Sequence, residues 1–274
     1  MVELDAATLR QLQLIELEIL TEIDRICRKN KIHYSLTGGT LLGAVRHGGF
    51  IPWDDDADIS MLRSEYRKFQ EACRTDLDEK RFYFQDIEHT AGYRWGYGKL
   101  RRKGTVFLRE NQESMPYEQG IWVDIFPRDG IPDGKISRKI HTFSCFVVRK
   151  IMWSPVGQKT ALNTPQKVIY VILAKIPEHV MKKIYGMLVR YSNHNKHTKL
   201  VRALTFPLPN NQKGYVRDWY RGYTQVKFEN RKFMVQSSYK EWLVAEFGDY
   251  MQLPPVEKRK VHPVTQLKLI NLGE

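Results

Sequence analysis

The segment that most constrains this chain is residues 37–62, TGGTLLGAVRHGGFIPWDDDADISML. It contains five glycines and four aspartates, and three of the aspartates are adjacent. Carboxylates this close repel one another, so a folded chain needs a reason to hold them together. The glycines and Pro52 indicate turns, and the ADISML run that follows the aspartates is typical of a β-strand. The acidic cluster is therefore expected at the start of a strand.

The spacing of two of the aspartates suggests what holds them. Side chains two residues apart on a strand point to the same face. If the chain is extended through DADIS, Asp56 and Asp58 share one face while Ala57 and Ile59 face the core. Two carboxylates on one exposed face can share a hard divalent cation, Mg²⁺ or Mn²⁺. We therefore predict a metal site; a solvated acidic turn is the alternative for the DDD tripeptide alone.

A third carboxylate stands in the run GIWVDIFPRDGIP, residues 120–132. Asp124 is a lone charge among apolar, β-like residues, where a free carboxylate is costly. We expect it to supply a third ligand from a neighbouring strand. A role at a strand end or as a cap is the alternative.

Glycines and basic residues near the aspartates are candidates for phosphate binding. Backbone at Gly38 and Gly39 can approach a phosphate without interference from a Cβ atom, and a helix that starts near Thr40 would present free N–H groups. The chain has neither the GxxxxGK[ST] loop nor a strand-linked GxGxxG motif. Lys99 and Arg101, two residues apart in YGKLR, can face the phosphates together. A solvated basic strand edge is the alternative for these two.

Arg46 ends the glycine-flanked segment and is another phosphate candidate, with a surface salt bridge as its alternative. His47 follows it and is the one histidine that we would test for function.

Composition narrows the class of protein. The chain has 274 residues, 42% hydrophobic and 12% aromatic, as in a globular protein. A net charge of +13 favours polyanionic partners. No RRM, KH, zinc-finger or basic-helix motif is present, so no nucleic-acid partner is expected. Cys27, Cys73 and Cys145 form no CxxC pair, so no structural zinc site is expected. Their odd, sparse count argues against a disulfide framework and fits a reducing compartment.

The expected location is the cytoplasm. The first 20 residues carry acids where a signal peptide has basic and then apolar residues. No run of 18 apolar residues is present that could span a membrane. Residues 167–190 are apolar, flanked by basic residues and broken by Pro177. They predict either a contact with the inner face of a membrane or a pair of core helices.

Periodicity outlines the rest of the chain. We expect a helix over residues 5–29, a second that Ser64 caps, and helices from 135 to 191 with breaks at Pro155, Pro165 and Pro177. Strands are expected near residues 81–86, 93–101, 105–110, 120–132 (closed by Pro127 and Gly130) and 224–235, and a last helix over 238–248. The order predicts a catalytic α/β half, 1–134, and a mostly helical half with a β-hairpin, 135–274, which completes the active site and binds the acceptor.

The stretch LTGGTLLGAVRHGGFIPWDDDADI resembles the LicD family, which shares this motif with the fukutin-related transferases. The resemblance continues through WGYGKLR, GIWVDIFPRDG and the distal YKEWLVAEFGDYMQLPP, so that it covers residues 36–255. It implies an α/β (α+β) nucleotidyltransferase fold of the DNA polymerase beta type with a helical C-terminal half. It also implies a Mg²⁺-dependent phosphotransfer site. Asp56, Asp58 and Asp124 would be its ligands, and residues 38–40 would form the phosphate turn.

The family resemblance also implies the reaction. LicD proteins transfer phosphocholine from CDP-choline to a sugar hydroxyl of a cell-wall, teichoic-acid or surface-glycan precursor, and the acceptor can be lipid-linked. Fukutin-related transferases use CDP-ribitol. Transfer of ribitol phosphate, or of a nucleotide to a small molecule, therefore stays open as an alternative. Asp124 or Asp54 would be the general base. Candidates for an aromatic choline cage are Trp53, Trp95, Tyr97 and Trp122.

Overall fold

A ten-residue strand, β6 (Trp122–Ile131), is the centre of the fold in the computed structural model, which describes residues 2, 4–207, 214–259 and 261–271. All ten residues of β6 are buried. It lies in a seven-stranded sheet with β1 (Ser35–Leu36), β2 (Asp58–Leu62), β3 (Phe82–Gln85), β4 (Gly98–Arg102), β7 (Leu200–Arg202) and β8 (Tyr215–Val216). The main path is β1-β2-β6-β4-β3, and β7 joins β6 to β8.

The neighbours of β6 explain how a proline lies inside it. We expected Pro127 and Gly130 to close this strand, and that prediction is wrong. The Asp124 N–H donates to Ala57 O on the β2 side, so by alternation Pro127 faces the other side. On that side β4 pairs only as far as Ile125, and β7 begins at Asp129. Pro127 therefore lies in the gap between the β4 and β7 pairings, where an N–H would have no strand to bind. Its lack of an N–H costs the sheet no hydrogen bond.

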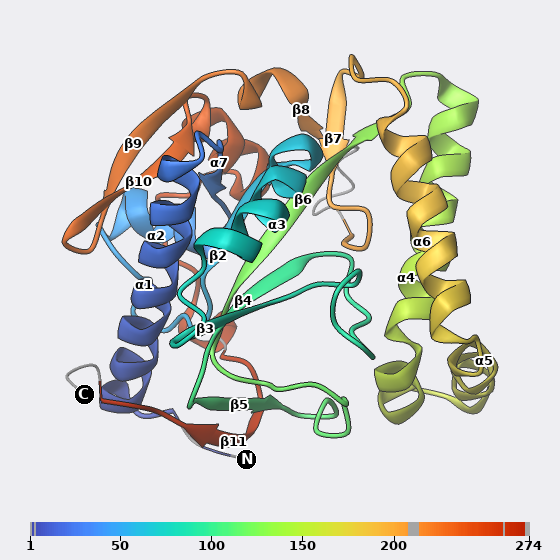
Figure 1. The fold of residues 1–274 in the computed structure, drawn as a ribbon, viewed down its shortest axis with the longest axis horizontal. Helices are drawn as coiled ribbons and strands as arrows, with labels where there is room; N and C mark the ends of the chain where they lie inside the picture. Colours follow the sequence, from blue (N-terminus) through green and yellow to red (C-terminus); the bar gives the residue numbers. More distant parts are fainter. Residues whose placement is uncertain (1, 3, 208–213, 260, 272–274) are drawn as a thin grey trace.

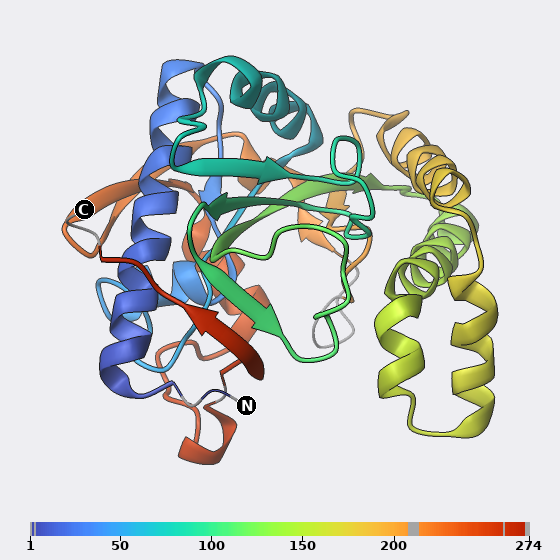
Figure 2. The ribbon, with the colours of Figure 1, turned by 60° about the horizontal axis from the view of Figure 1, so that its bottom comes forward.

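The described part of the chain has seven helices. They are α1 (Ala6–Lys29), α2 (Gly38–Arg46), α3 (Arg63–Asp76), α4 (Lys135–Thr160), α5 (Thr164–Ala174), α6 (Glu178–Asn193) and α7 (Tyr239–Phe247). Of these, α4, α5 and α6 form a helical group to one side of the sheet (Figure 1, Figure 2). Short 3-10 turns cover Arg217–Tyr220 and Val256–Lys258. None of the described helices is long and apolar enough to cross a bilayer. The predicted mixed α/β class is confirmed.

The first helix buries the apolar stripe that its sequence predicted. Leu12, Ile15, Ile19, Ile23 and Ile26 are fully buried, and α1 packs on β4, β6 and α3. The Asp5 carboxylate caps α1 by accepting the Thr8 N–H at 2.7 Å. Each of these fully buried side chains contributes about 1.5–3 kcal/mol of transfer free energy.

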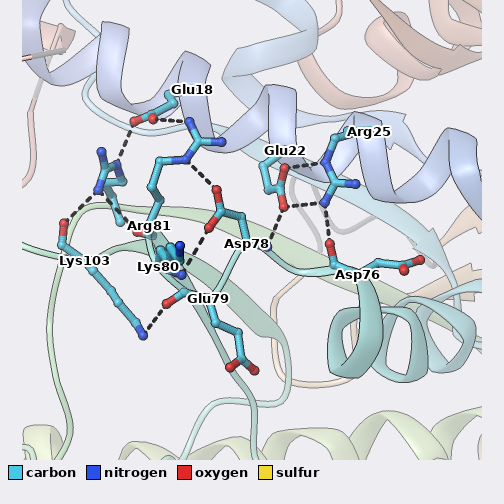
Figure 3. Close-up of polar contacts among 10 residues, drawn as sticks. Glu18, Glu22, Arg25, Asp76, Asp78, Glu79, Lys80, Arg81 and Lys103 are labelled. Carbon is cyan, nitrogen blue, oxygen red and sulfur yellow. Dashed lines mark hydrogen bonds and ion pairs between the residues drawn. The ribbon is translucent and has the colours of Figure 1, made fainter. Parts of the chain in front are cut away.

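Charged side chains fasten the outer face of α1 (Figure 3). Glu18 accepts from Arg81 at 2.9 Å and from Arg102 at 2.8 Å, so it joins α1 to the start of β3 and to β4. Glu22 pairs with Arg25, which also donates to the backbone oxygen of Asp76 at the end of α3. The network fixes the helix against the sheet edge.

Two helix boundaries differ from the prediction. The helix α3 begins at Arg63, directly after β2, and Leu62 rather than Ser64 precedes it. Pro155 does not break α4. The Ile151 carbonyl, which a residue 155 N–H would otherwise bind, accepts instead from Ser154 Oγ at 2.7 Å and Arg94 Nη2 at 3.0 Å.

Segments after residue 134 build onto the same framework. Two further two-stranded sheets pair β9 (Tyr223–Phe228) with β10 (Arg231–Gln236), and β5 (Val106–Arg109) with β11 (Val264–Lys268). The hairpin contacts α2 and β1. The strands β7, β8 and β11 were not predicted. The division of the chain at residue 134 stays a prediction.

A buried ion pair joins α3, β6 and α6. Arg63 binds both carboxylate oxygens of Asp129 at 2.7 Å and reaches the Tyr185 hydroxyl at 3.1 Å. Asn193 also donates to Asp129, at 2.6 Å. Asp129 is fully buried. The pair holds α6 to the sheet, and α4 and α5 pack with α6 in one helical group.

We predict that Asp129→Ala lowers the free energy of unfolding by about 3–5 kcal/mol, because it leaves the Arg63 charge buried and unpaired. Urea unfolding followed by circular dichroism measures the change. The matched control is Glu71→Ala, which removes the exposed pair with Arg74 and should change stability by less than about 0.5 kcal/mol. Equal effects of the two variants would contradict this role for the buried pair.

Candidate active site

Parallel pairing of β2 and β6 brings the predicted carboxylates together. Asp58 lies opposite Asp124 in the register of the two strands. Asp56 lies two residues before Asp58, just ahead of the first residue of β2. All three line one cavity of about 290 Å³. The sequence therefore identified three residues that the fold places at one site.

Asp58 is the residue whose surroundings most clearly call for a cation. Its backbone N–H donates to the Thr40 hydroxyl at 2.7 Å, which fixes the first turn of α2 against β2. Its Oδ1 atom is buried and has no hydrogen-bond partner in the described part of the chain. Burial, and then the charges of Asp56 and Asp124, raise the pKa of Asp58 well above its usual range. An unpartnered carboxylate oxygen beside other carboxylates is a natural ligand for a divalent ion.

The arrangement fits a site that the substrate completes. Among the described residues, no three His, Cys, Asp or Glu side chains are already grouped around one ion position. Asp124 Oδ1 accepts a hydrogen bond from Lys99 Nζ instead. Mg²⁺ is commonly held by one or two carboxylates together with substrate phosphates and water. Asp56 and Asp58 fit that pattern; metal ligation by these two residues and by Asp124 stays a prediction.

Lys99 and Arg101, the two basic residues of β4 that we predicted for phosphate binding, both line the cavity. They differ in the protein groups that they already bind. Lys99 is buried, lies 4.1 Å from the centre of the Trp122 ring, and faces Asp124. Burial lowers the pKa of Lys99 to about 7, although Asp124 acts in the opposite direction. Arg101 donates to Gln85 Oε1 at 2.6 Å and to the Gly120 carbonyl, so its guanidinium is already held by the protein.

The two glycines that begin α2, Gly38 and Gly39, lie against the aspartates. Gly38 has a φ of +59°, and a Cβ atom there would lie 2.9 Å from Asp58 Oδ2. A Cβ atom on Gly39 would lie only 2.3 Å from Asp54 Oδ2. The N-terminus of α2 thus faces carboxylates, which its backbone dipoles favour. Phosphate binding at residues 38–40 stays a prediction.

Arg46 lies apart from this cavity. Its guanidinium donates to the backbone oxygens of Tyr250 at 3.0 Å and Gln252 at 3.3 Å. It ties α2 to the segment after α7, and among the described residues it neither lines the cavity nor forms a salt bridge. Its placement gives no support to the predicted phosphate contact.

Asp54, the second candidate for the general base, does not line the cavity either. Burial, and then the charges of Asp56 and Asp55, raise the pKa of Asp54 to about 8. Asp124 lines the cavity and is therefore the better placed of the two base candidates, Asp54 and Asp124. His47 packs edge-on against Trp53, with ring centres 6.0 Å apart, and it too lies outside the cavity.

The aromatic candidates separate into two groups. Trp95 and Tyr97 line the cavity, whereas Trp53 lies outside it beneath Arg259, 4.2 Å from the guanidinium carbon. Trp122 borders the cavity, but the Lys99 ammonium covers its ring. Trp153 from α4 and Phe206 from the segment after β7 complete the aromatic wall.

Residues 31–145 match the family model described as LicD/FKTN/FKRP, nucleotidyltransferase domain. The chain is 31% identical over 276 residues to the lipopolysaccharide cholinephosphotransferase LicD of Haemophilus influenzae, covering 96% of this chain and 98% of that protein. The chain belongs to the LicD family. It is also 27% identical over 100 residues to human ribitol 5-phosphate transferase FKRP, which is 36% of this chain and 18% of that protein.

The prediction of a phosphotransferase is thereby confirmed at the level of the family. In this LicD-family chain, the three carboxylates and Lys99 all lie within the matched residues. Trp153, Phe206 and His262 come from outside them, and they line the same cavity. The C-terminal half therefore contributes side chains to the site.

Sequence reasoning missed several cavity residues. His262 lies beside β11, and its backbone N–H donates to Asp55 Oδ2 at 2.9 Å while its Nδ1 lies 4.0 Å from Asp56 Oδ2. No local pattern marks it, because a strand pairing far along the chain brings it in. Arg128, which lines a neighbouring hollow and not this cavity, did have a sequence signal. It follows Asp124 and Phe126 at a spacing of two, so it lies on the same strand face.

Arg128 belongs to a smaller hollow of about 150 Å³ at the N-terminus of α2. It donates to Thr37 Oγ1 at 3.0 Å. Asp58 borders this hollow as well as the larger cavity. One carboxylate therefore stands between two spaces that can hold different parts of a ligand.

We predict that Gly39→Ala lowers the free energy of unfolding by about 1–3 kcal/mol, since its Cβ atom must displace Asp54 or the start of α2. The matched control is Gly186→Ala in α6, where the nearest atom is the end of a flexible Arg190 side chain, 3.6 Å away. That change should be neutral or slightly stabilising. Chemical denaturation of the two variants tests the difference, and a neutral Gly39→Ala would contradict it.

A pH-dependent effect is expected from Glu16, a buried residue of α1 whose Oε2 atom has no hydrogen-bond partner in the described residues. Burial, and then the charges of Asp56, Asp55 and Asp54, raise the pKa of Glu16 well above its ordinary value of 4.5. A raised carboxyl pKa contributes stability below the unfolded pKa, and this is lost as the pH rises.

We therefore predict that Glu16→Gln stabilises the protein increasingly between about pH 5 and pH 8, because glutamine stays neutral in both the folded and the unfolded state. Thermal unfolding in EDTA across this range measures the effect. The exposed Glu71→Gln serves as the control and should show no such trend. A pH-independent difference between Glu16→Gln and the parent protein would contradict the assignment.

Proposed function

We propose that this protein transfers phosphocholine from CDP-choline to a sugar hydroxyl of a surface-glycan precursor and releases CMP. The proposal rests on the pair Asp56 and Asp58, which lies beside Lys99 in an aromatic-lined cavity. The Oδ1 atom of Asp58 has no hydrogen-bond partner among the described residues. The near full-length similarity to a lipopolysaccharide cholinephosphotransferase supports phosphocholine as the group transferred.

We infer a catalytic core of the DNA polymerase beta type. Carboxylates in register on adjacent strands, next to the glycine-led start of α2, support this inference. The name of the matching family model, a nucleotidyltransferase domain, supports it as well.

Asp56 and Asp58 would hold Mg²⁺ (or Mn²⁺), with Asp124 as the third carboxylate. When bound, the ion would supply charge neutralisation for the diphosphate and the departing CMP. Lys99 is a second positive group at the same place, next to Asp124. Arg109 also borders the cavity and adds to its positive field.

The chemistry needs positioning and electrostatic stabilisation more than covalent catalysis. The acceptor oxygen attacks the phosphorus that bears choline. One O–P bond forms as the bond from that phosphorus to the CMP oxygen breaks, and the hydroxyl proton passes to a carboxylate. Asp124 lines the cavity and is our candidate for that base, with Lys99 holding its carboxylate in place.

The walls of the cavity suit a quaternary ammonium group. Trp95, Tyr97, Trp153 and Phe206 border it, and choline binds to the faces of aromatic rings without hydrogen bonds. A polyol would need polar partners, and Gln112 and Gln119 are also on the wall. Those two side chains, with the similarity to FKRP, favour ribitol phosphate as the second candidate.

Calorimetric titration tests the donor and the metal together. We expect CDP-choline to bind in Mg²⁺ and to lose most of its affinity in EDTA, and CDP-ribitol and CTP to bind more weakly. Asp58→Asn should reduce the affinity for CDP-choline by about tenfold or more, since it removes a charged ligand. The exposed Asp249→Asn serves as the control. Preferred binding of CDP-ribitol would favour the second candidate, and preferred binding of CTP would favour nucleotidyl transfer.

A further inference from the structure

Residues 135–177 are strongly and uniformly basic. They contain six lysines and two arginines, and neither aspartate nor glutamate occurs between Asp133 and Glu178. This segment comprises α4, α5 and their connections. Its charge of +8 is therefore a large part of the net +13 of the whole chain.

The same segment exposes an apolar stripe along α4. Ile136, Ile140, Phe143, Phe146 and Trp153 follow one another at spacings of three, four or seven residues, which places them on one helix face. Their exposed fractions lie between 37% and 77%. Lys139, Arg149 and Lys150 are interleaved with them. Large side chains this exposed and this regularly spaced mark an interaction surface.

The next helix continues this surface. In α5, Tyr170 is the one buried residue, while Val168, Ile169 and Ile172 are more than half exposed. Leu162, in the connection before α5, is 92% exposed. Figure 1 and Figure 2 show α5 at the outer end of the helical group, away from the sheet. The helix α5 packs on α4, where the Tyr170 hydroxyl accepts from Lys150 Nζ at 2.8 Å. Its exposed apolar residues have no cover among the described residues, and they point to a partner.

The exposed surface differs from the one that the sequence predicted over residues 167–190. In α6, the residues Met181, Tyr185, Leu188 and Val189 are buried, and they belong to the core that α4 also lines. The unpartnered face therefore belongs to α4 and α5, which we call the α4–α5 face.

We propose that the α4–α5 face docks on an anionic lipid bilayer. Apolar and aromatic side chains interleaved with lysine and arginine, without acidic residues, are the pattern of helices that lie in a membrane interface. Basic side chains near the surface are attracted to acidic headgroups. A second copy of the chain is disfavoured as the occupant because two faces of this charge repel each other.

The face continues to the catalytic cavity. A hollow of about 360 Å³ is lined by Arg149, Lys150 and Trp153 of α4, and by Tyr170 of α5. It shares Trp153 and three further residues, Trp95, Tyr97 and Phe206, with the catalytic cavity. Docking would thus bring the cavity close to the lipid surface, where, if the proposed function holds, a lipid-linked acceptor could enter.

Vesicle flotation tests the docking without any substrate or transfer. The probes are vesicles of phosphatidylcholine alone and of phosphatidylcholine mixed with phosphatidylglycerol, at low and at high salt. The wild-type protein should float with the mixed vesicles at low salt and dissociate at high salt. It should bind the neutral vesicles more weakly.

Matched variants locate the surface. Ile169→Ser with Ile172→Ser, and Lys167→Glu with Lys175→Glu, should each weaken binding at least about tenfold. The controls are Val244→Ser with Met251→Ser, which are as exposed as Ile169 and Ile172 but lie outside the face, and Lys227→Glu with Lys240→Glu. Both controls should bind as the wild type does, and circular dichroism should show that all variants are folded.

Three outcomes would overturn the proposal. One is a wild-type protein that does not float with anionic vesicles at low salt. Another is an equal loss of binding in the control variants. The last is a wild-type dimer in size-exclusion chromatography that Ile169→Ser with Ile172→Ser converts to a monomer while vesicle binding is absent, because the face would then join two copies. Since no donor is present, failure of docking leaves the proposed transfer reaction untouched.

Discussion

Repulsion among crowded carboxylates is the constraint on which the site depends. The parallel pairing of β2 and β6 places Asp58 opposite Asp124. The start of α2 approaches so closely that a Cβ atom at residue 38 or 39 would clash with an aspartate oxygen. Lys99 binds Asp124, and His262 holds Asp55. Within the part of the chain that the structure describes, Asp58 Oδ1 has no hydrogen-bond partner. The protein therefore compensates part of the negative charge itself, and we propose that a divalent cation compensates the remainder.

The local elements of the site were predictable because they depend on short-range patterns. Alternation in DADIS placed Asp56 and Asp58 on one face, and a lone charge in an apolar run identified Asp124. The apolar spacing of residues 12–26 predicted α1. Pro127 was wrongly expected to close its strand. The strand continues because Pro127 faces the gap between β4 and β7, and local sequence does not reveal where neighbouring strands begin and end. His262 and Phe206 enter the cavity through long-range packing, which leaves no local pattern in the sequence.

The two halves of the chain meet at the cavity. β4 and β6 supply the charged wall, while α4 and the segment after β7 supply Trp153 and Phe206. The buried pair of Arg63 and Asp129 ties α6 to this framework. A surface formed by the helical group can in this way affect access to the charged wall, which connects the docking proposal to the proposed transfer.

The central claim is that Asp56 and Asp58 form a divalent-metal site that a nucleotide completes. Mn²⁺ titration followed by electron paramagnetic resonance, with and without CDP-choline, tests it most directly. The account predicts one bound Mn²⁺ per chain, tighter with CDP-choline, and its loss in Asp56→Ala but not in Asp249→Asn. Absence of Mn²⁺ binding in the presence of CDP-choline, or unchanged binding in Asp56→Ala, would contradict the account.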